Sequence, residues 1–462
     1  MAIDVTDEMM AEWPAEAQAV IRLLLAEIAE LKARLKQTPQ NSSRPPSSQH
    51  PHAKPVPAKP KSSRQPGGQP GHAKHERALI PSEQCTAVVP LKPTACRRCG
   101  HQLAGVDVAP WRHQVWEVAE IKPFVTEYQR HRLHCAGCGI TTCAALPAGV
   151  PHGQAGPRLI GLTALLMGCF RQSKRRVALF LEQVLNQPCS PGWVVKLQQQ
   201  ATVALRPAYE QLARQLPEQA VLGIDESPTK QQRDKAWVWT FVAHAFTVFA
   251  LRTTRAATVL SQVLTDRFHG IVMCDRARMY WSLGRLQWCW AHLKRDVQAL
   301  IDSDDRQAKR LGRELLPLIQ QLFRHWSRCR DGTITRRGLQ QLMAPLRREV
   351  EALLLRGEFS GNDRLHGFCR ELHDHRDWLW AFVDHAGVEP TNNASERALR
   401  HPVIWRKLSF GTQSASGSRF VETMLTVIET CRQRRRNTFA FITQAVEAHF
   451  AGHPTPLLLT GP

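Results

Sequence analysis

Three carboxylates of this sequence stand in local settings that suit metal-ion chemistry. Asp225 ends the apolar, strand-like run VLGI, and Asp275 ends a second such run, IVMC. Glu396 falls in the first turn of a helix that we expect to begin after Asn392-Asn393, whose side chains supply turn and cap chemistry. Carboxylates from two strand ends and one helix can hold two Mg²⁺ or Mn²⁺ ions about 3.5–4 Å apart, which clamp both oxygens of an in-line phosphoryl displacement. We therefore predict that Asp225, Asp275 and Glu396 are catalytic, metal-binding residues.

Each of these acids also has a simpler interpretation. Glu226 adjoins Asp225, but neighbouring side chains of a strand point to opposite faces, so only one is expected to face the metals. Asp275 could merely cap the helix that follows it, which is a common use of Asp. Glu389 competes with Glu396, although the helix dipole favours a carboxylate in the first turn. Whether Glu226 or Glu389 assists the metal site stays open at this point.

The elements that must position these acids follow a recognisable order. After the strand that carries Asp225, β-branched and aromatic runs at 236–243 and 247–251 predict two further strands of a meander. A helical stretch at 256–267 leads to a strand at 270–274 that ends at Asp275, and residues 286–290 predict a fifth strand. Strand-strand-strand-helix-strand, with acids ending the first and fourth strands, is the order of a ribonuclease H-like core.

The charge of the chain favours a polyanionic partner. Its 462 residues include 61 Lys and Arg against 40 Asp and Glu, a formal net charge of +21, and basic side chains supply the sequence-independent part of nucleic-acid affinity. A charge that serves solubility or attraction to a membrane surface is the alternative. The N-terminus lacks a secretory signal, and the longest apolar stretch, 159–170, is too short to cross a bilayer. Thirteen cysteines without an export signal argue for reduced thiols, so we expect a cytoplasmic, nucleoid-associated protein without a membrane partner.

Two cysteine pairs predict a structural zinc site. Cys96 and Cys99, and likewise Cys135 and Cys138, form CxxC motifs that are each followed by Gly. Four thiolates match the tetrahedral preference of Zn²⁺. Strand-like patches at 114–118 and 124–128 could form a hairpin that brings the pairs together. Unrelated core or reactive thiols are the alternative.

A helical region at 157–216 resembles a helix-turn-helix. A break at 186–188 separates two helices, and Ser190 is a natural N-cap with Pro191 at the first helical position. The second helix could enter a major groove of DNA while basic residues of the first hold phosphates. These are Lys174, Arg175 and Arg176. Packing in a plain helical bundle fits almost as well.

The remaining segments complete a multidomain chain of α+β and α/β class. Apolar residues from Ile21 to Leu35 form a short heptad seam, which indicates either dimerisation or docking on the same protein. The predicted domains are an N-terminal helix (1–36), a flexible basic linker (37–75), a zinc-binding module (76–150), a helix-turn-helix-like DNA-binding domain (151–217), a ribonuclease H-like core in two parts (218–295 and 386–436), a helical insertion between them (296–385), and a C-terminal helix and tail (437–462).

Over nearly its whole length, the chain resembles the large transposase of bacterial insertion sequences of the type numbered sixty-six. The likeness includes the motifs NSSRPPSS, GGQPGH, the paired cysteines, DES at 225–227, CWAH at 289–292 and, most specifically, NNASERALR at 392–400. The resemblance implies a DDE transposase with a ribonuclease H-like core, and it assigns Asp225, Asp275 and Glu396 to the metal-binding triad. The chain departs from the family pattern at Ser227, where Thr is usual, and at Arg276-Ala277, where a Gly-aromatic pair is common.

Two further sets of residues gain a role from this resemblance. Cys289 and His292 are too few for a closed zinc centre, but related DDE enzymes carry a similar Cys-x-x-His after the second acid, which implies that they position DNA or brace the core. Basic residues on or after the helix of Glu396 are expected to contact the DNA backbone, with a solvated helix face as the alternative. They are Arg397, Arg400, Arg406 and Lys407.

The expected function is that of a DNA transposase. It would bind the terminal inverted repeats of an insertion sequence and carry out metal-dependent strand cleavage and strand transfer on double-stranded DNA. The resemblance further implies small accessory proteins of the same element, and pairing of two element ends implies a homo-oligomer on DNA. A ribonuclease H-like nuclease that cuts without joining and a non-catalytic DNA-binding regulator are the alternatives.

Overall fold

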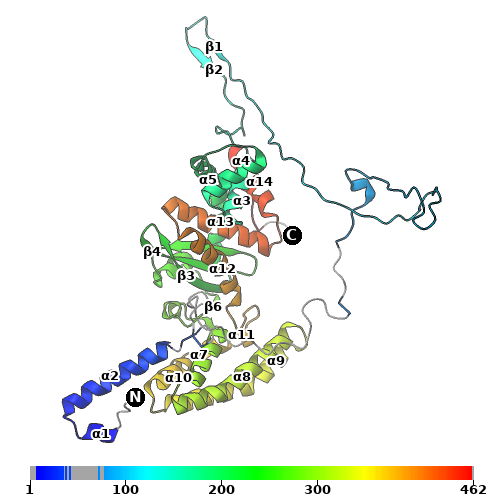
Figure 1. Ribbon diagram of the computed structural model, residues 1–462. Helices are drawn as coiled ribbons and strands as arrows, with labels where there is room; N and C mark the ends of the chain where they lie inside the picture. The colour runs from blue at the N-terminus through cyan, green and yellow to red at the C-terminus, as the bar shows by residue number, and fades with distance from the viewer. Residues whose placement is uncertain (1–6, 36, 39–40, 43–70, 73–76, 460–462) are drawn as a thin grey trace. The chain divides into compact units, whose positions relative to one another are not determined.

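The computed structural model describes residues 7–35, 37–38, 41–42, 71–72 and 77–459 (Figure 1). These fall into two units, one formed by residues 1–49 and 123–462 and the other by residues 50–122. The linker predicted at 37–75 lies almost entirely outside the described residues.

The described residues of the 50–122 unit form loops and turns, without a β-strand or an α-helix. It contains a single turn of 3₁₀ helix, η2 (Ser82–Gln84), and an isolated bridge between Ala95 and Gln102. The side chain of Gln114 fixes one of its loops, because its Oε1 accepts from the N–H of Ile80 at 3.0 Å while its Nε2 donates to the C=O of Ile80 at 2.8 Å. The cysteine knuckle of Cys96 lies in this unit.

A five-stranded mixed sheet forms the centre of the larger unit. Its strands are β3 (Val221–Gln231), β4 (Asp234–Val242), β5 (Thr247–Arg252), β6 (Ile271–Cys274) and β7 (Leu286–Trp288). They lie in the order β5-β4-β3-β6-β7, with β3 antiparallel to β4, β4 antiparallel to β5, and both β6 and β7 parallel to their neighbours. The helix α6 (Thr258–Leu264) connects β5 to β6. A strand or helix was expected from the sequence at each of these places, but the expected end of the first strand at Asp225 is wrong, because β3 continues to Gln231 in its pairing with β4.

Burial explains why these segments form strands. Strand β6 is buried along its whole length, as a central parallel strand covered on both faces must be. Large aromatic side chains of the meander, including Trp239, Phe241 and Phe249, are fully buried. Burying an aliphatic or aromatic side chain of this size stabilises a fold by about 1.5–3 kcal/mol. The sheet is therefore the rigid base from which the acids project.

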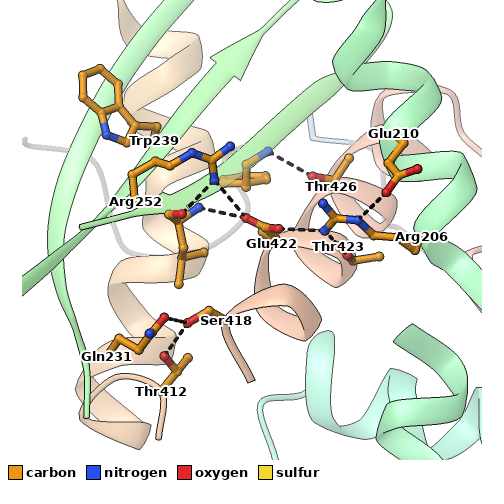
Figure 2. A network of polar contacts seen from close by, with 12 residues as sticks. Arg206, Glu210, Gln231, Trp239, Arg252, Thr412, Ser418, Glu422, Thr423 and Thr426 are labelled. Carbon is orange, nitrogen blue, oxygen red and sulfur yellow. Dashed lines mark hydrogen bonds and ion pairs between the residues drawn. The ribbon is translucent and has the colours of Figure 1, made fainter. Parts of the chain in front are cut away.

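Helix α13 (Ala415–Gln433) covers the outer edge of β5 with a polar stripe. Glu422, Thr426 and Thr430 recur every four residues and therefore share one helix face. Their side-chain oxygens accept hydrogen bonds from backbone N–H groups of alternate residues along β5, at 3.0, 3.0 and 3.3 Å. Figure 2 shows the first two of these bonds. Because an open edge strand offers unpaired backbone groups to other chains, this helix closes the sheet on that side.

Glu422 also joins the edge strand to a preceding helix. Its side chain is only 6 % exposed, and its Oε1 accepts from Nη1 of Arg206 at 2.7 Å. Nη1 of Arg252, at the end of β5, lies 3.5 Å from its Oε2 (Figure 2). Two half-exposed arginines thus neutralise one buried carboxylate.

The helices before the sheet match the predicted helix-turn-helix pattern. They are α3 (Pro157–Gly168), α4 (Lys174–Leu185) and α5 (Pro191–Arg214). Helix α4 ends with Asn186 in the left-handed conformation (φ 50°), and Ser190 caps α5 by accepting from the N–H of Trp193 at 3.2 Å. Helix α5 packs against α13, and α3 packs against the C-terminal helix α14 (Thr438–Phe450) (Figure 1).

A group of helices occupies the predicted insertion between β7 and the third acid. It comprises α7 (Trp290–Asp302), α8 (Arg306–Arg330), α9 (Arg336–Glu358), α10 (Asp363–Asp374) and α11 (Asp377–Asp384). Neighbouring helices α7 to α10 pack pairwise, and α11 returns to the sheet beside β7. The buried side chain of Gln287 in β7 holds α11 against the sheet. Its Nε2 donates to the C=O of Leu379 at 3.2 Å, and its Oε1 accepts from the N–H of Phe382 at 2.8 Å.

Other segments bear on the remaining expectations. Near the N-terminus, α1 (Asp7–Ala11) precedes α2 (Ala15–Leu35), whose seam residues Leu24, Ile28 and Leu31 are exposed. The hairpin expected from 114–118 and 124–128 is wrong, because neither segment forms a strand and their large apolar side chains are exposed. A shorter hairpin of β1 (Arg132–His134) and β2 (Thr141–Cys143) carries the second cysteine pair instead. Among the described residues, none of the helices combines the length and apolar character that a membrane crossing needs.

Candidate active site and cysteine knuckles

Asp225 lies on the central strand β3 beside a second acid. Its Oδ1 accepts a hydrogen bond from the backbone N–H of Glu226 at 2.9 Å. The side chain of Glu226 is 3 % exposed and is bound by Arg255, whose Nη2 lies 2.6 Å from its Oε1, and by the hydroxyl of the buried Tyr280. Glu226 is thus held by Arg255 and Tyr280, partners that the sequence did not reveal.

Asp275 follows directly after the buried strand β6. Because β6 pairs in parallel with β3, with Gly223 opposite Met273, continuing this register places Asp275 beside Asp225. Asp275 lies just beyond the end of β6, whereas Asp225 lies within β3. The Oδ1 of Asp275 accepts from the N–H of Ala277 at 2.9 Å, so this acid also stabilises the turn that leads to the 3₁₀ helix η4 (Arg278–Leu283). Asp275 does not cap this helix, as the sequence also allowed, because the N-cap residue of η4 is Ala277 and no side chain caps it.

Glu396 lies in the first turn of α12 (Asn393–Ser409), as expected. The residue at the N-cap, Asn392, makes no capping bond with its side chain; its Nδ2 instead donates to the C=O of Ile224 on β3 at 2.7 Å. Gly223 allows this approach, because a Cβ at that position would lie 2.5 Å from Oγ of Ser395 and 3.1 Å from Oδ1 of Asn392. The expected capping role of Asn392 is wrong, since its amide is used to fix the helix to the strand next to Asp225.

The other end of α12 is also attached to β3. Nη1 of Arg406 donates to Oγ of Ser227 at 3.1 Å and also to the C=O of Pro228. After the helix, Gly411 (φ +103°) lies against the C=O of Lys230, and the N–H of Thr412 donates to that carbonyl at 2.9 Å. The hydroxyl that Ser227 retains relative to the family pattern therefore has a structural use.

The carboxylates of the site interact electrostatically. Burial raises the pKa of Asp225 well above its ordinary value, and the charges of Glu226, Asp275 and Glu396 raise it further, against one backbone hydrogen bond. Burial also raises the pKa of Glu396, while Arg295, Arg400 and Arg397 oppose the shift. Mutual repulsion of this kind is expected where a cation belongs, because a bound cation reverses the local pKa shifts.

Cys289 and His292 lie against Glu396 rather than apart from it. One ligand atom from each of these three residues lies within 4.8 Å of the other two, and no other such group of three is present in the described part of the chain. Nδ1 of His292 lies 3.6 Å from Oε1 of Glu396. Burial lowers the pKa of His292 to about 4, so the imidazole is neutral at neutral pH. The sequence did not indicate that this pair meets the third acid.

Arg276, one of the departures from the family pattern, joins the second acid to the insertion. Its Nη2 donates to Oδ2 of Asp296 on α7 at 2.9 Å, and its Nη1 to Oε1 of Glu371 on α10 at 2.8 Å. The guanidinium also lies 5.3 Å from the ring centre of Phe368. A lone Arg in the sequence gave no signal of these partners.

Most residues predicted to contact DNA are exposed to solvent, and one is bound within the protein. The first turn of α4 exposes three basic side chains, Lys174, Arg175 and Arg176. Helix α12 exposes three more along its length, Arg397, Arg400 and Lys407. Cations at a helix N-terminus oppose the helix dipole, so the basic start of α4 is not there for helix stability. Arg406 is committed to β3, and burial lowers its pKa. Glu389 is exposed, with only its backbone N–H placed beside β6.

The two CxxC motifs have the same backbone geometry, one in each unit. In the first, the N–H of Gly100 donates to the C=O of Cys96 at 2.9 Å, and in the second the N–H of Gly139 donates to the C=O of Cys135 at 2.9 Å. Both glycines have positive φ, 72° and 73°. Backbone N–H groups within each turn lower the pKa of Cys96 and of Cys135, which favours thiolate ligands.

Two related family models match most of the chain. The family described as "Transposase IS66 family" matches residues 152–419, more than half of the chain, and the "zinc-finger binding domain of transposase IS66" matches residues 93–139, which include all four paired cysteines. A family of unknown function, DUF6444, matches residues 6–78.

Two curated relatives come from Sinorhizobium fredii. The uncharacterized protein y4qI is 23 % identical over 259 residues, which cover 49 % of this chain and 46 % of that protein. The uncharacterized protein y4jO is 26 % identical over 173 residues, which cover 36 % of this chain and 51 % of that protein. The chain thus spans about half the length of these relatives.

Proposed function

Because the chain belongs to the IS66 family of transposases, we propose that it cuts and joins DNA at Asp225, Asp275 and Glu396 and binds the terminal inverted repeats of an insertion sequence. The observation that supports the proposal is the attachment of α12, whose first turn carries Glu396, to β3, the strand that carries Asp225. The strand order β5-β4-β3-β6-β7, with an antiparallel meander followed by two parallel strands, supports a ribonuclease H-like core.

The residues of the site fit divalent cations. Asp225, Asp275 and Glu396 are the proposed ligands, and they supply the oxygen donors that Mg²⁺ and Mn²⁺ prefer. Oε1 of Glu396 is buried without a hydrogen-bond partner, and burial and neighbouring charges raise the pKa of Asp225, so a cation would relieve both costs. Such ions, when bound, supply the charge that stabilises an in-line displacement at phosphorus and that activates the attacking oxygen.

The other side chains of the chain position and hold the reactants. Arg397 and Arg400 stand one and four residues after Glu396, so one helix can offer its acid to the metals and its guanidinium groups to DNA phosphates. The basic first turn of α4 is a second phosphate-binding surface, with α5 as the helix for the major groove. The cysteine knuckles are proposed to share one structural Zn²⁺. We also propose a homo-oligomer on DNA, with the accessory proteins of the element as further partners.

A strand-joining assay tests the proposal. Element ends taken from the inverted repeats beside the gene, each with a free 3′-hydroxyl, are incubated with target plasmid, the protein and Mg²⁺ or Mn²⁺. We expect covalent joining that Asp225→Asn abolishes, whereas the exposed control Asp266→Asn retains it. Cleavage without joining would favour a nuclease, and specific DNA binding with neither reaction would favour a regulator.

A further inference from the structure

Cys289, His292 and Glu396 form a cluster in which two of the three donors, the thiol and the imidazole, do not belong to a magnesium site. A thiolate and an imidazole suit Zn²⁺ and similar transition metals, whereas Mg²⁺ takes oxygen ligands. Their ligand atoms already lie within 4.8 Å of one another. In a tetrahedral zinc site the ligand atoms stand about 3.4–3.6 Å apart, so adjustments of about 1 Å would complete the set.

The backbone holds these residues together independently of any ion. Cys289 precedes α7 and His292 lies in its first turn, while Glu396 lies in the first turn of α12. The two helix starts are joined where the N–H of Asn392 donates to Sγ of Cys289 at 3.3 Å and the N–H of Trp290 donates to the C=O of Pro390 at 2.8 Å. The geometry of the cluster is therefore set by the fold.

Two of the three ligand atoms are buried and unsatisfied. Nδ1 of His292 and Oε1 of Glu396 have no hydrogen-bond partner, and they lie 3.6 Å from each other. A buried polar group without a partner costs about 1–3 kcal/mol. A cation placed between them would satisfy both atoms at once.

We propose that Cys289, His292 and Glu396 form a binding site for a thiophilic divalent cation of the Zn²⁺ class, with a fourth position open to water. On binding, the thiol of Cys289 releases its proton to solvent and its sulfur coordinates the ion. The thiolate and the carboxylate then balance the two charges of the cation, so that the nearby Arg295 meets a neutral cluster. This site is separate from the cysteine knuckles.

The site has a consequence for the active centre, which rests on the function proposed above. Glu396 is the one residue common to the thiophilic site and to the proposed magnesium centre. An ion bound by Cys289 and His292 would keep the carboxylate of Glu396 beside the imidazole. That carboxylate could then not bind a Mg²⁺ ion together with Asp225 and Asp275. Thiophilic cations are therefore expected to inhibit strand joining.

Zinc content of the full-length protein tests the binding. Wild type, Cys289→Ser and His292→Gln are dialysed against the same buffered free Zn²⁺, and zinc per chain is measured; the knuckles contribute equally to all of them. We expect the two variants to hold one ion fewer than wild type, with an affinity at this site at least about tenfold weaker. Cys369→Ala, at a buried cysteine of α10, is the control and should bind as wild type does. Equal zinc content in wild type and in the folded variants would overturn the proposal, and if Cys289→Ser does not fold, His292→Gln decides.

The effect on catalysis is measured separately, as the ratio of joining with and without added Zn²⁺ for each protein in Mg²⁺. We expect a large fall in this ratio for wild type and Cys369→Ala, and a smaller fall for His292→Gln. An unchanged ratio in wild type at a zinc level that fills the site would overturn the inhibitory role. If no protein joins DNA although the zinc contents differ as expected, the proposed function fails while the metal site stands.

Discussion

The contact between Gly223 and the start of α12 allows a direct test of how Glu396 is positioned. In a Gly223→Ala variant, the new Cβ would lie 2.5 Å from Oγ of Ser395, about 1 Å closer than ordinary van der Waals contact. Both residues are buried, and Asn392 is tied to Ile224 by its amide, so the helix cannot adjust by rotating an exposed side chain. Relief requires that α12 move away from β3.

The size of the effect follows from these contacts. Overpacking a buried position by one methyl group typically costs about 1–3 kcal/mol, and loss of the Asn392–Ile224 hydrogen bond would add about 1 kcal/mol. Ser395→Ala removes the clashing oxygen, which is itself buried without a partner, so this change alone is expected to be neutral or slightly stabilising. The double variant Gly223→Ala/Ser395→Ala should therefore recover about 1 kcal/mol or more relative to additivity.

Thermal melting of the four proteins, together with the strand-joining assay, checks this reasoning. Gly367→Ala is a matched control, because Gly367 lies inside α10 with open space around it, and the change should stabilise the helix by about 0.5–1 kcal/mol. We expect joining to fall in Gly223→Ala and to return in part in the double variant. Additive melting effects with unchanged joining would refute the idea that this contact positions Glu396.

Three other predictions concern the site, the sheet edge and the knuckles. Burial and neighbouring carboxylates raise the pKa of Asp225 in the folded state, so the free energy of unfolding should fall as pH rises from about 4 through the raised pKa. At pH 8 without Mg²⁺, Asp225→Asn should therefore melt at a higher temperature than wild type, and added Mg²⁺ should raise its melting temperature less. Glu422→Ala should cost about 1–3 kcal/mol in denaturant unfolding, because it leaves the N–H of Leu251 without its acceptor and removes the carboxylate from two partly exposed arginines, whereas Glu210→Ala, at the exposed partner of Arg206, should cost about 0–1 kcal/mol. If the four paired cysteines share one Zn²⁺, Cys99→Ser and Cys138→Ser should each lose the same single ion, and independent losses that add would show two separate sites.

Periodicity and turn chemistry were enough to locate the elements around the acids. The strands that carry Asp225 and Asp275 were expected because each apolar run is short, rich in β-branched residues and ended by a polar residue. Ser190 and Pro191 marked the start of α5 because an N-cap hydroxyl and a Pro at the first position are local requirements of a helix. Such features depend on neighbours in the sequence, so a single chain reveals them.

Contacts between distant segments were beyond the reach of the sequence. Asn392 was expected to cap its own helix, but its amide binds the C=O of Ile224, a partner 168 residues away. The strand-like runs at 114–118 and 124–128 form no ladder, because β-propensity is expressed only where a strand can pack against neighbours. The partners of Arg276 and Glu226 are also distant in the sequence, so the sequence did not reveal them.

The structure also explains how a long helical insertion leaves the site intact. Residues 291–389 leave and rejoin the core at two points that are bonded directly to each other, where the N–H of Trp290 meets the C=O of Pro390 and the N–H of Asn392 meets Sγ of Cys289. With its ends fixed in this way, the insertion contributes a closed loop, and lengthening such a loop costs little free energy, about 0.6 kcal/mol per doubling. The separation of Glu396 from Asp225 is then set mainly by α12 and β3. Arg276, next to Asp275, bonds to Glu371 on α10, and His292 on α7 lies 3.6 Å from Glu396, so the insertion contacts the surroundings of the second and third acids. Movement of α10 would therefore reach the second acid through Arg276.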